Sequence, residues 1–377
     1  DLGTLDSLTA RVWWGDGTAP EPGIVTQDWS SPVGALEGRN GTVDLSHTYP
    51  YPGIYTVTVC VADDDQPDVP VCDSLRMTIV HGFVKMAVFG GAHPEDASGH
   101  SPGKVDIHKE SMIDGWVGAT GEVRLAKGIE VDGSVISVTD RVKVYDTGII
   151  AGDVVAGTVA YVKKHSSVAG DVHAGDRAKV DDDATVGGGI YEGPDASPYP
   201  EVTWVDADLP TESKDKVKVK RAPLVLPPAT YGDVKVQYGS LELSSGTYRF
   251  DDLSTHRADF YVDLDPDGDG VAEPLVVWVR DKLDLEGSMT ITSAVGDASG
   301  VLFIVGDKAE LKKAEAYVGT FLVPDGKARI DKDSTLVGAV YAADVDVEDR
   351  VSVTYLPARE AFVEVFVPVI VPGAIPI

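Results

Sequence analysis

The chain carries three kinds of apolar patterning, and each predicts a different β element. Over residues 1–82, short runs alternate apolar and polar residues, as in LTARVWW, TVDLSHTY, IYTVTVCVA and LRMTIV, with glycine and proline turns between them. Alternation with a period of two is typical of half-buried antiparallel strands. We therefore expect a β-sandwich over residues 1–82.

A second pattern begins near residue 112, where small apolar residues recur at every sixth position. Turn-like glycines repeat every 18 or 19 residues, at Gly115, Gly133, Gly152, Gly170 and Gly188. Three six-residue steps make one coil, whereas an α-helix needs a period of 3.6. The pattern predicts a triangular parallel β-solenoid with coils about 4.8 Å apart. One series of the pattern is Ile150, Ala156, Val162, Val168, Ala174, Val180 and Val186.

The solenoid pattern is interrupted and then resumes. Proline, aspartate and lysine dominate residues 193–230, which we interpret as an excursion from the coils. Strand-turn-strand units then return at 226–250, 274–291 and 318–355. We assign residues 83–357 to the solenoid.

The last segment, residues 358–377, is apolar on both faces of a predicted extended strand. Such a strand is stable only when it is buried on both sides. Glu364 and three prolines make it a poor membrane span. We predict that it forms a subunit interface through Phe362, Val363, Val365, Phe366, Val367, Val369, Ile370 and Val371.

Composition narrows the class of protein. The 377 residues include 32 Lys+Arg and 61 Asp+Glu, a formal net charge of −29, which excludes a nucleic-acid binder or a binder of anionic membranes. The hydrophobic share of 43% is enough for a buried core. No apolar run is long enough to span a membrane, and the chain opens on Asp1 without an apolar leader. We expect a soluble mature chain or a fragment.

The two cysteines lie close together in the sequence. Cys60 lies near the end of one alternating run, and Cys72 lies near the start of the next. The polar stretch 63–70 separates the two runs. This placement favours a disulfide across a hairpin, the alternative being two free buried thiols. A disulfide implies an oxidising, extracytoplasmic setting.

Three separated motifs in the first 82 residues point to a family. WWGDGT (13–18), SHTYPYPGIYTVTV (46–59) and VADDD (61–65) together resemble the polycystic-kidney-disease (PKD) domain, an immunoglobulin-like β-sandwich common in bacterial and archaeal surface proteins. The chain departs from that family by lacking its first strand. A sandwich that lacks a strand exposes a sheet edge and an apolar groove, where a strand from elsewhere can bind.

The later segments resemble another group of surface proteins. LPPATYGDV, LELSSGTYRF and VGAVYAAD are similar to the solenoid domains of bacterial pilus-associated and polymer-forming surface proteins, and distantly to bactofilin. The resemblance covers roughly residues 85–357 and implies a right-handed parallel β-helix. The expected fold class is thus all-β: a PKD-like sandwich, a parallel β-helix and a C-terminal extended strand.

The strongest candidate for a ligand site is the segment DLDPDGDGVAE. Alternating carboxylates on a glycine-rich turn supply the hard oxygen ligands that Ca²⁺ prefers. The full EF-hand spacing fails, because its twelfth position is Pro274 or Val276 depending on register. The alternative is a plain acidic hairpin tip. The candidate ligands are Asp263, Asp265, Asp267 and Asp269.

Two further groups of residues offer weaker chemistry. His93, His100 and His108 are spaced irregularly in a glycine-rich stretch, which weighs against a zinc site. Asp153 and Asp171 lie one coil apart, as carboxylates do in polysaccharide-acting β-helices, but two stacked aspartates equally suit a metal or a solvated edge.

These patterns favour a noncatalytic extracellular structural protein that requires no cofactor. We expect a subunit of a surface filament or stalk, in which the C-terminal strand of one copy enters the incomplete sandwich of the next. The alternative is a secreted, adhesin-like module that binds carbohydrate or another surface in the presence of calcium, with cell-surface or matrix polysaccharide as its partner. A polysaccharide-acting β-helix enzyme comes third.

Overall fold

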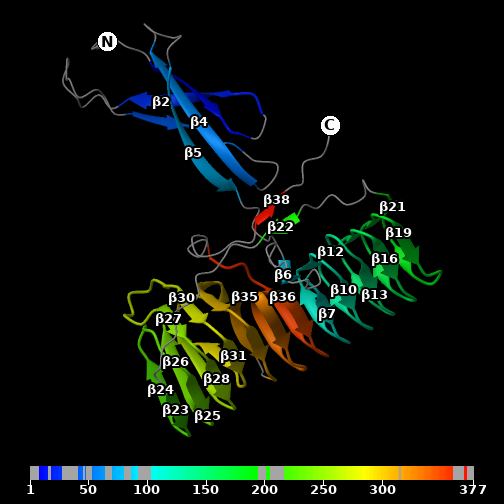
Figure 1. The fold of residues 1–377 in the computed structure, drawn as a ribbon, viewed down its shortest axis with the longest axis vertical. Coiled ribbons are helices and arrows are strands. Elements are labelled where there is room, and N and C mark those ends of the chain that lie inside the picture. Colours follow the sequence, from blue (N-terminus) through cyan, green and yellow to red (C-terminus); the bar gives the residue numbers. More distant parts are fainter. Residues whose placement is uncertain are drawn as a thin grey trace. The chain divides into compact units, whose positions relative to one another are not determined.

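A computed structural model shows a chain that is almost entirely β-strand (Figure 1). It divides into two compact units, Asp1–His81 with Val369–Ile377, and Gly82–Pro368. The structure describes residues 8–15, 18–27, 41–45, 47, 53–63, 70–79, 86–91, 103–193, 201–203, 216–313, 316–359 and 369–371.

The first unit contains a five-stranded antiparallel sheet with the strand order β3-β2-β1-β4-β5. Val12, Trp14 and Val57 are buried on it, and the Trp14 ring stacks on His47 at 4.6 Å between centroids. The alternating runs therefore form strands as expected, while β2 lies in a stretch where no run was predicted. The strands are β1 (Leu8–Trp13), β2 (Glu21–Gln27), β3 (Gly41–Asp44), β4 (Gly53–Asp63), β5 (Val71–Ile79) and, at the C-terminus, β38 (Val369–Val371).

The second unit is a stack of parallel coils, and its first part, here called the N-terminal arm, runs to residue 193. Its in-register pairs, such as Val105 with Val123 and Val123 with Val142, follow the 18- and 19-residue spacing of the sequence. Its strands are β6 (Met86–Gly90), β7 (Val105–Ile107), β8 (Met112–Asp114), β9 (Trp116–Ala119), β10 (Val123–Leu125), β11 (Glu130–Val131), β12 (Val135–Ser137), β13 (Val142–Val144), β14 (Ile149–Ile150), β15 (Val154–Ala156), β16 (Val159–Val162), β17 (Ser167–Val168), β18 (Val172–Ala174), β19 (Arg177–Val180), β20 (Thr185–Val186) and β21 (Ile190–Glu192).

The C-terminal arm, residues 216–355, continues the same architecture after β22 (Glu201–Thr203). Regular coils resume at Val217, so residues 217–226 belong to the stack and not to the predicted excursion. Its strands are β23 (Val217–Lys220), β24 (Pro223–Leu226), β25 (Val234–Gln237), β26 (Ser240–Ser244), β27 (Gly246–Phe250), β28 (Leu253–His256), β29 (Asp259–Asp263), β30 (Leu275–Val279), β31 (Lys282–Leu285), β32 (Met289–Ile291), β33 (Val301–Val305), β34 (Lys308–Leu311), β35 (Tyr317–Ile330), β36 (Thr335–Val347) and β37 (Ser352–Tyr355).

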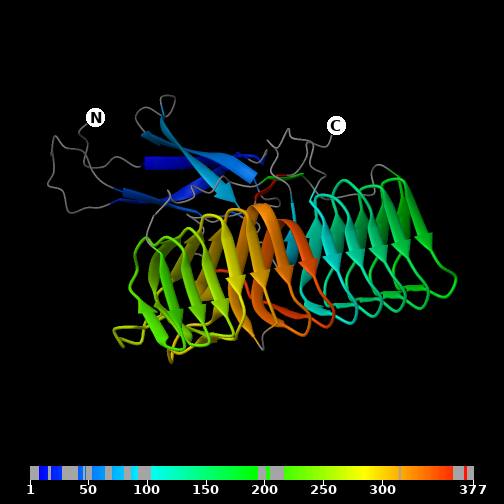
Figure 2. The same ribbon diagram turned by 60° about the horizontal axis from the view of Figure 1, so that its bottom comes forward.

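The two arms are not stacked in chain order. β36 pairs with β6 and β7, and β37 pairs with β8, so the last coils of the C-terminal arm lie directly on the first coil of the N-terminal arm. In Figure 2 the orange coils lie beside the cyan ones in a single stack. We call this junction the seam. The solenoid chain therefore begins in the middle of the stack, winds to one end, crosses to the other end and returns.

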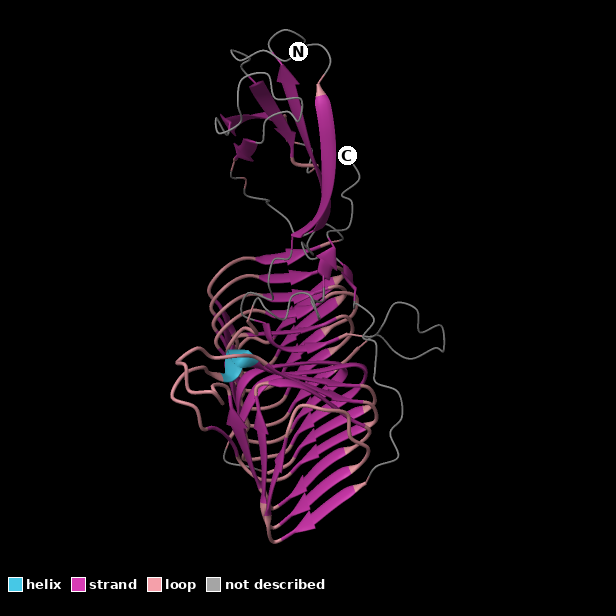
Figure 3. Cartoon of the chain, turned by 90° about the vertical axis from the view of Figure 1, so that its left-hand side faces the viewer, coloured by secondary structure: helices cyan, strands magenta, loops and turns pink. Residues whose placement is uncertain are grey.

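The faces of the stack differ in polarity. One face, here called the charged face, alternates buried apolar residues with outward polar residues. Its strands are β7, β10, β13, β16 and β19 in the N-terminal arm, and β23, β25, β28, β31, β34 and the ends of β35 and β36 in the C-terminal arm. A second face is apolar on its outside as well, since Ile304, Leu322 and Phe89 are at most 2% exposed. A short 3-10 turn, η2 (Ala298–Gly300), lies outside the coils (Figure 3).

Candidate functional site

The acidic segment forms a loop between β29 and β30. Asp265, Asp267 and Asp269 each offer a carboxylate oxygen, and these oxygens lie within 4.8 Å of one another. Asp263 does not join them, because it lies at the end of β29 and its Oδ1 accepts the backbone N–H of Asp265 at 3.1 Å. Three of the four predicted ligands are thus brought together.

Local chemistry explains why the loop closes around these carboxylates. Gly268 and Gly270 have φ values of 72° and 83°, a region that favours glycine. The backbone N–H of Gly270 donates to Asp265 Oδ2 at 3.2 Å, and that of Val271 donates to Asp269 Oδ1 at 2.8 Å. Such side-chain to backbone bonds are characteristic of aspartate in turns, so they hold the loop without an ion.

The environment of the cluster suits a hard cation. Asp265 Oδ1 is buried and has no hydrogen-bond partner in the part of the chain that the structure describes, while Asp267 and Asp269 are exposed. Glu273, which follows the cluster, accepts the Ser245 hydroxyl at 2.9 Å and so is engaged elsewhere. The loop therefore presents three carboxylates to a cation. If each gives one oxygen, they supply fewer than the six to eight oxygen ligands that Ca²⁺ takes, and water supplies the remaining ligands.

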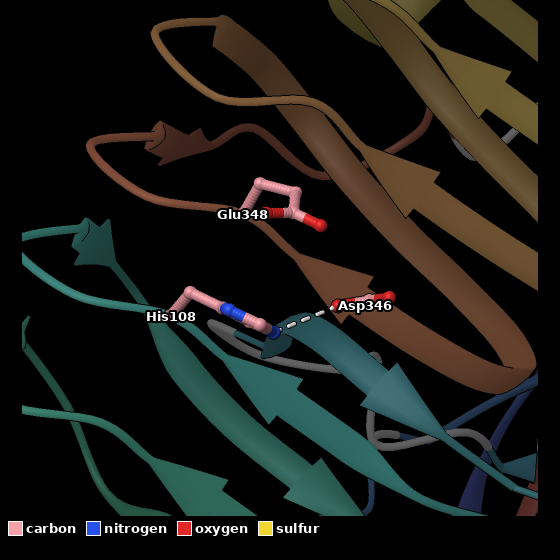
Figure 4. Close-up of side chains that lie close together, drawn as sticks. All are labelled: His108, Asp346 and Glu348. Atoms are coloured by element: carbon pink, nitrogen blue, oxygen red, sulfur yellow. Dashed lines mark ion pairs between the residues drawn. The ribbon is translucent and has the colours of Figure 1, made fainter.

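A second cluster joins residues that are far apart in the sequence. His108 follows β7, whereas Asp346 and Glu348 belong to β36 and the turn after it (Figure 4). Sequence reasoning considered His108 only with His93 and His100, which lie outside the described residues. The carboxylate partners were missed because only the pairing of β36 with β7 brings them to the histidine.

Asp153 and Asp171 are aligned as the repeat predicts, but their oxygens are committed to the main chain. Asp153 Oδ1 accepts the backbone N–H of Asp171 at 2.8 Å, and Asp171 Oδ1 accepts that of Gly189 at 2.7 Å. Each aspartate therefore fastens its own coil to the next. This geometry favours the structural interpretation of the pair over acid/base chemistry.

The predicted disulfide is confirmed. Cys60 and Cys72 face each other on β4 and β5, and their sulfurs are bonded. The bond lies across neighbouring antiparallel strands of one sheet, as the flanking alternating runs indicated.

The predicted interface residues of the C-terminal strand fall mostly outside the described residues. Val369, Ile370 and Val371 form β38, which lies against β4 in the unit that contains the five-stranded sheet. The remaining members of the predicted interface, Phe362, Val363, Val365, Phe366 and Val367, lie outside the described residues.

Comparisons with known proteins give one distant neighbour. No protein-family model matches the chain, and no curated protein matches it. Among solved structures, the chain is similar to the crystal structure of an ice binding protein from an Antarctic bacterium, Flavobacteriaceae, at 12% sequence identity and a TM-score of 0.24, covering 70% of this chain and 83% of that one. Within the described residues, no helix has both the length and the hydropathy of a membrane span.

Proposed function

We propose that this chain is a noncatalytic extracellular structural protein. The observation that carries the proposal is the charged face, where ion pairs join one coil to the next across both arms. In the C-terminal arm, Lys282 Nζ lies 2.8 Å from Glu310 Oε2. In the N-terminal arm, Lys143 Nζ lies 2.7 Å from Glu122 Oε1. Such a stack is a stiff element in which each coil is supported by its neighbours. The disulfide supports an extracytoplasmic location.

The more specific proposal is that copies assemble head to tail into a surface filament by strand addition. The PKD-like motifs and the five-stranded antiparallel sheet support a first unit of the sandwich type, to which a strand can be added at a sheet edge. β38 lies against β4 in its own chain. Exchange of that strand between copies would repeat the same contact between molecules, which is a low-cost route to assembly.

Electron microscopy of the full chain beside a chain that ends at Arg359 tests this proposal. Arg359 is retained because its backbone N–H donates to Ser299 O at 3.0 Å and its Nη1 to Ala272 O at 2.9 Å, so the shortened chain keeps these solenoid contacts. We expect filaments from the full chain alone. Monodisperse particles from both chains would contradict the proposal that copies assemble by strand addition.

A full-length variant separates loss of assembly from loss of folding. Ile370→Asp places a charge within β38, a strand that is not part of the stacked coils. If assembly depends on burial of this strand, the variant should remain monomeric while its circular dichroism matches that of the parent. Filaments from the variant as abundant as those of the parent would contradict the proposed interface.

The acidic loop supports a second candidate function, a calcium-dependent module that binds carbohydrate or another surface. Calorimetric titration of CaCl₂ should show binding that is lost in Asp265→Ala and Asp267→Ala. Asp263→Ala is the matched control, because this carboxylate lies outside the cluster. Equal heats from all four proteins would exclude the loop as a calcium site.

A further inference from the structure

The seam differs from every other coil junction of the solenoid because no short connection crosses it. Residues paired there are about 240 apart in the sequence, as in the bonds from Lys104 N to Asp344 Oδ1 at 2.9 Å and from Lys109 N to Asp349 Oδ1 at 3.1 Å. Elsewhere the chain itself joins each coil to the next. The seam is therefore held by noncovalent contacts alone, and any cross-link there joins the two arms.

His108, Asp346 and Glu348 meet at the seam on the charged face. The backbone N–H of His108 donates to Val347 O at 2.7 Å, which fixes the start of its side chain against β36. His108 Nε2 lies 3.2 Å from Asp346 Oδ1, and one ligand atom of each of the three residues lies within 4.8 Å of the others. Figure 4 shows the imidazole directed at Asp346, with Glu348 beside them.

Two cations hold the carboxylates from the opposite side. Lys327 Nζ lies 3.1 Å from Asp346 Oδ2, and Arg329 Nη2 lies 2.7 Å from Glu348 Oε1. Both cations come from β35, whereas His108 approaches from β7, so lysine and histidine contact different oxygens of Asp346. Carboxylates that bind metal ions are commonly held by outer hydrogen-bond donors in this way.

The contact between His108 and Asp346 is an ion pair when the imidazole is protonated, and its length also suits two ligands of one metal ion. Asp346 Oδ1 is buried and has no partner with hydrogen-bond geometry among the described residues, although the imidazole nitrogen is only 3.2 Å away. Two ligand atoms about 2.0–2.1 Å from a tetrahedral Zn²⁺ are separated by roughly 3.3 Å. The 3.2 Å between His108 Nε2 and Asp346 Oδ1 matches that separation.

From these contacts we infer that the seam binds a divalent transition metal, with Zn²⁺ as the best match, through His108, Asp346 and Glu348. One imidazole and two carboxylates favour such an ion over Ca²⁺, which takes oxygen ligands. Water completes the coordination. The ion joins β7 to β36 and so stabilises the contact between the arms.

The same face offers a matched control. His256 Nδ1 lies 2.5 Å from Glu286 Oε2, a histidine–carboxylate pair of similar exposure, and no third ligand atom joins it among the described residues. This pair lies between coils of the C-terminal arm and does not cross the seam. A metal that needed only a histidine beside a carboxylate would bind there equally well.

The experiment is calorimetric titration of ZnCl₂ into the chelator-treated full chain, with Ca²⁺ present so that the acidic loop does not compete. We expect one Zn²⁺ per chain. Binding should weaken at least about tenfold in His108→Ala and in Glu348→Gln, and stay unchanged in His256→Ala. The midpoint of thermal unfolding should rise with Zn²⁺ in the parent and not in His108→Ala.

Equal zinc affinity in the parent and both seam variants, or no binding by the parent, would overturn the inference. Glu348→Gln guards against misfolding of His108→Ala, because the amide oxygen still accepts from Arg329 while the ligand charge is lost. Circular dichroism of each variant establishes that the comparison is made between folded proteins.

Discussion

Among the described residues, the interior of the N-terminal arm holds aliphatic side chains alone, whereas the interior of the C-terminal arm combines aliphatic side chains with aromatic rings. Val123, Val142 and Ala160 stack in one inner column of the first arm, all at 0% exposure. In the second arm Phe303 stacks on Phe321 at 4.7 Å between ring centroids. One architecture thus accepts two kinds of core.

Coil length also differs between the arms. In the N-terminal arm, residues paired from Val105 onward are 18 or 19 apart, whereas β6 pairs with β9 at a spacing of 29 or 30 residues. In the C-terminal arm, Val234 pairs with Leu253 but Leu253 pairs with Leu283, a step of 19 followed by one of 30, because the second coil includes the acidic loop. Large rings fill the interior of the C-terminal arm at the density that protein interiors require.

The largest loss of stability is expected when an aromatic ring is removed from the interior of the C-terminal arm. Phe303→Ala should cost about 3–5 kcal/mol, because the side chain is fully buried and contacts Phe260 and Phe321. Val154→Ala in the other arm should cost about 2 kcal/mol. Hydrogen exchange measured separately for each arm checks both values, since a long stack need not unfold in one step. Similar losses in the two arms would remove the distinction between the cores.

The next effect tests the aspartates that fasten the coils of the N-terminal arm. Asp171→Ala leaves the backbone N–H of Gly189 without its acceptor and should cost about 1.5–3 kcal/mol. Asp171→Asn keeps an acceptor oxygen and should cost less. Chemical denaturation of the two variants compares them, and equal losses would show that the hydrogen bond is not the stabilising contact.

A smaller effect depends on pH and belongs to the C-terminal arm. Burial alone raises the pKa of the Glu310 carboxyl, but hydrogen bonds from Lys282 and Lys308 outweigh it and hold the pKa at about 2, below the ordinary 4.5. The stabilisation is therefore complete above about pH 4.5 and is lost as the pH falls toward 2. Glu310→Gln should cost about 1–2 kcal/mol at pH 7 and almost nothing near pH 2. A pH-independent loss in thermal unfolding experiments would contradict this origin.

The smallest effect is the response to salt. In the C-terminal arm, ion pairs of Lys282, Lys312 and Arg329 connect neighbouring coils on the charged face. At the end of the N-terminal arm, Lys163 and Lys179 lie over the ring of Tyr161 instead. Raising the salt concentration to 1 M should destabilise the C-terminal arm by about 0.5 kcal/mol more, because exposed ion pairs are screened. Arm-resolved hydrogen exchange at two salt concentrations measures the difference.

Much of this fold could be predicted from residue spacing. The 18-residue repeat, the hairpin disulfide and the acidic loop all depend on neighbours in the sequence, so local patterns were sufficient. The seam could not be predicted, because nothing in the residues of β36 distinguishes β6 from any other strand with the same period. For the same reason the sequence offered His108 without Asp346 and Glu348.

The seam also decides how the solenoid would respond to tension. The chain enters at Met86 and leaves after Tyr355, and the strands that hold these two residues belong to coils at the seam. Force applied to the two ends of the solenoid chain would shear those few coils first and leave both arms without load. Either arm can then gain or lose whole coils at its free end without moving the points where the chain enters and leaves.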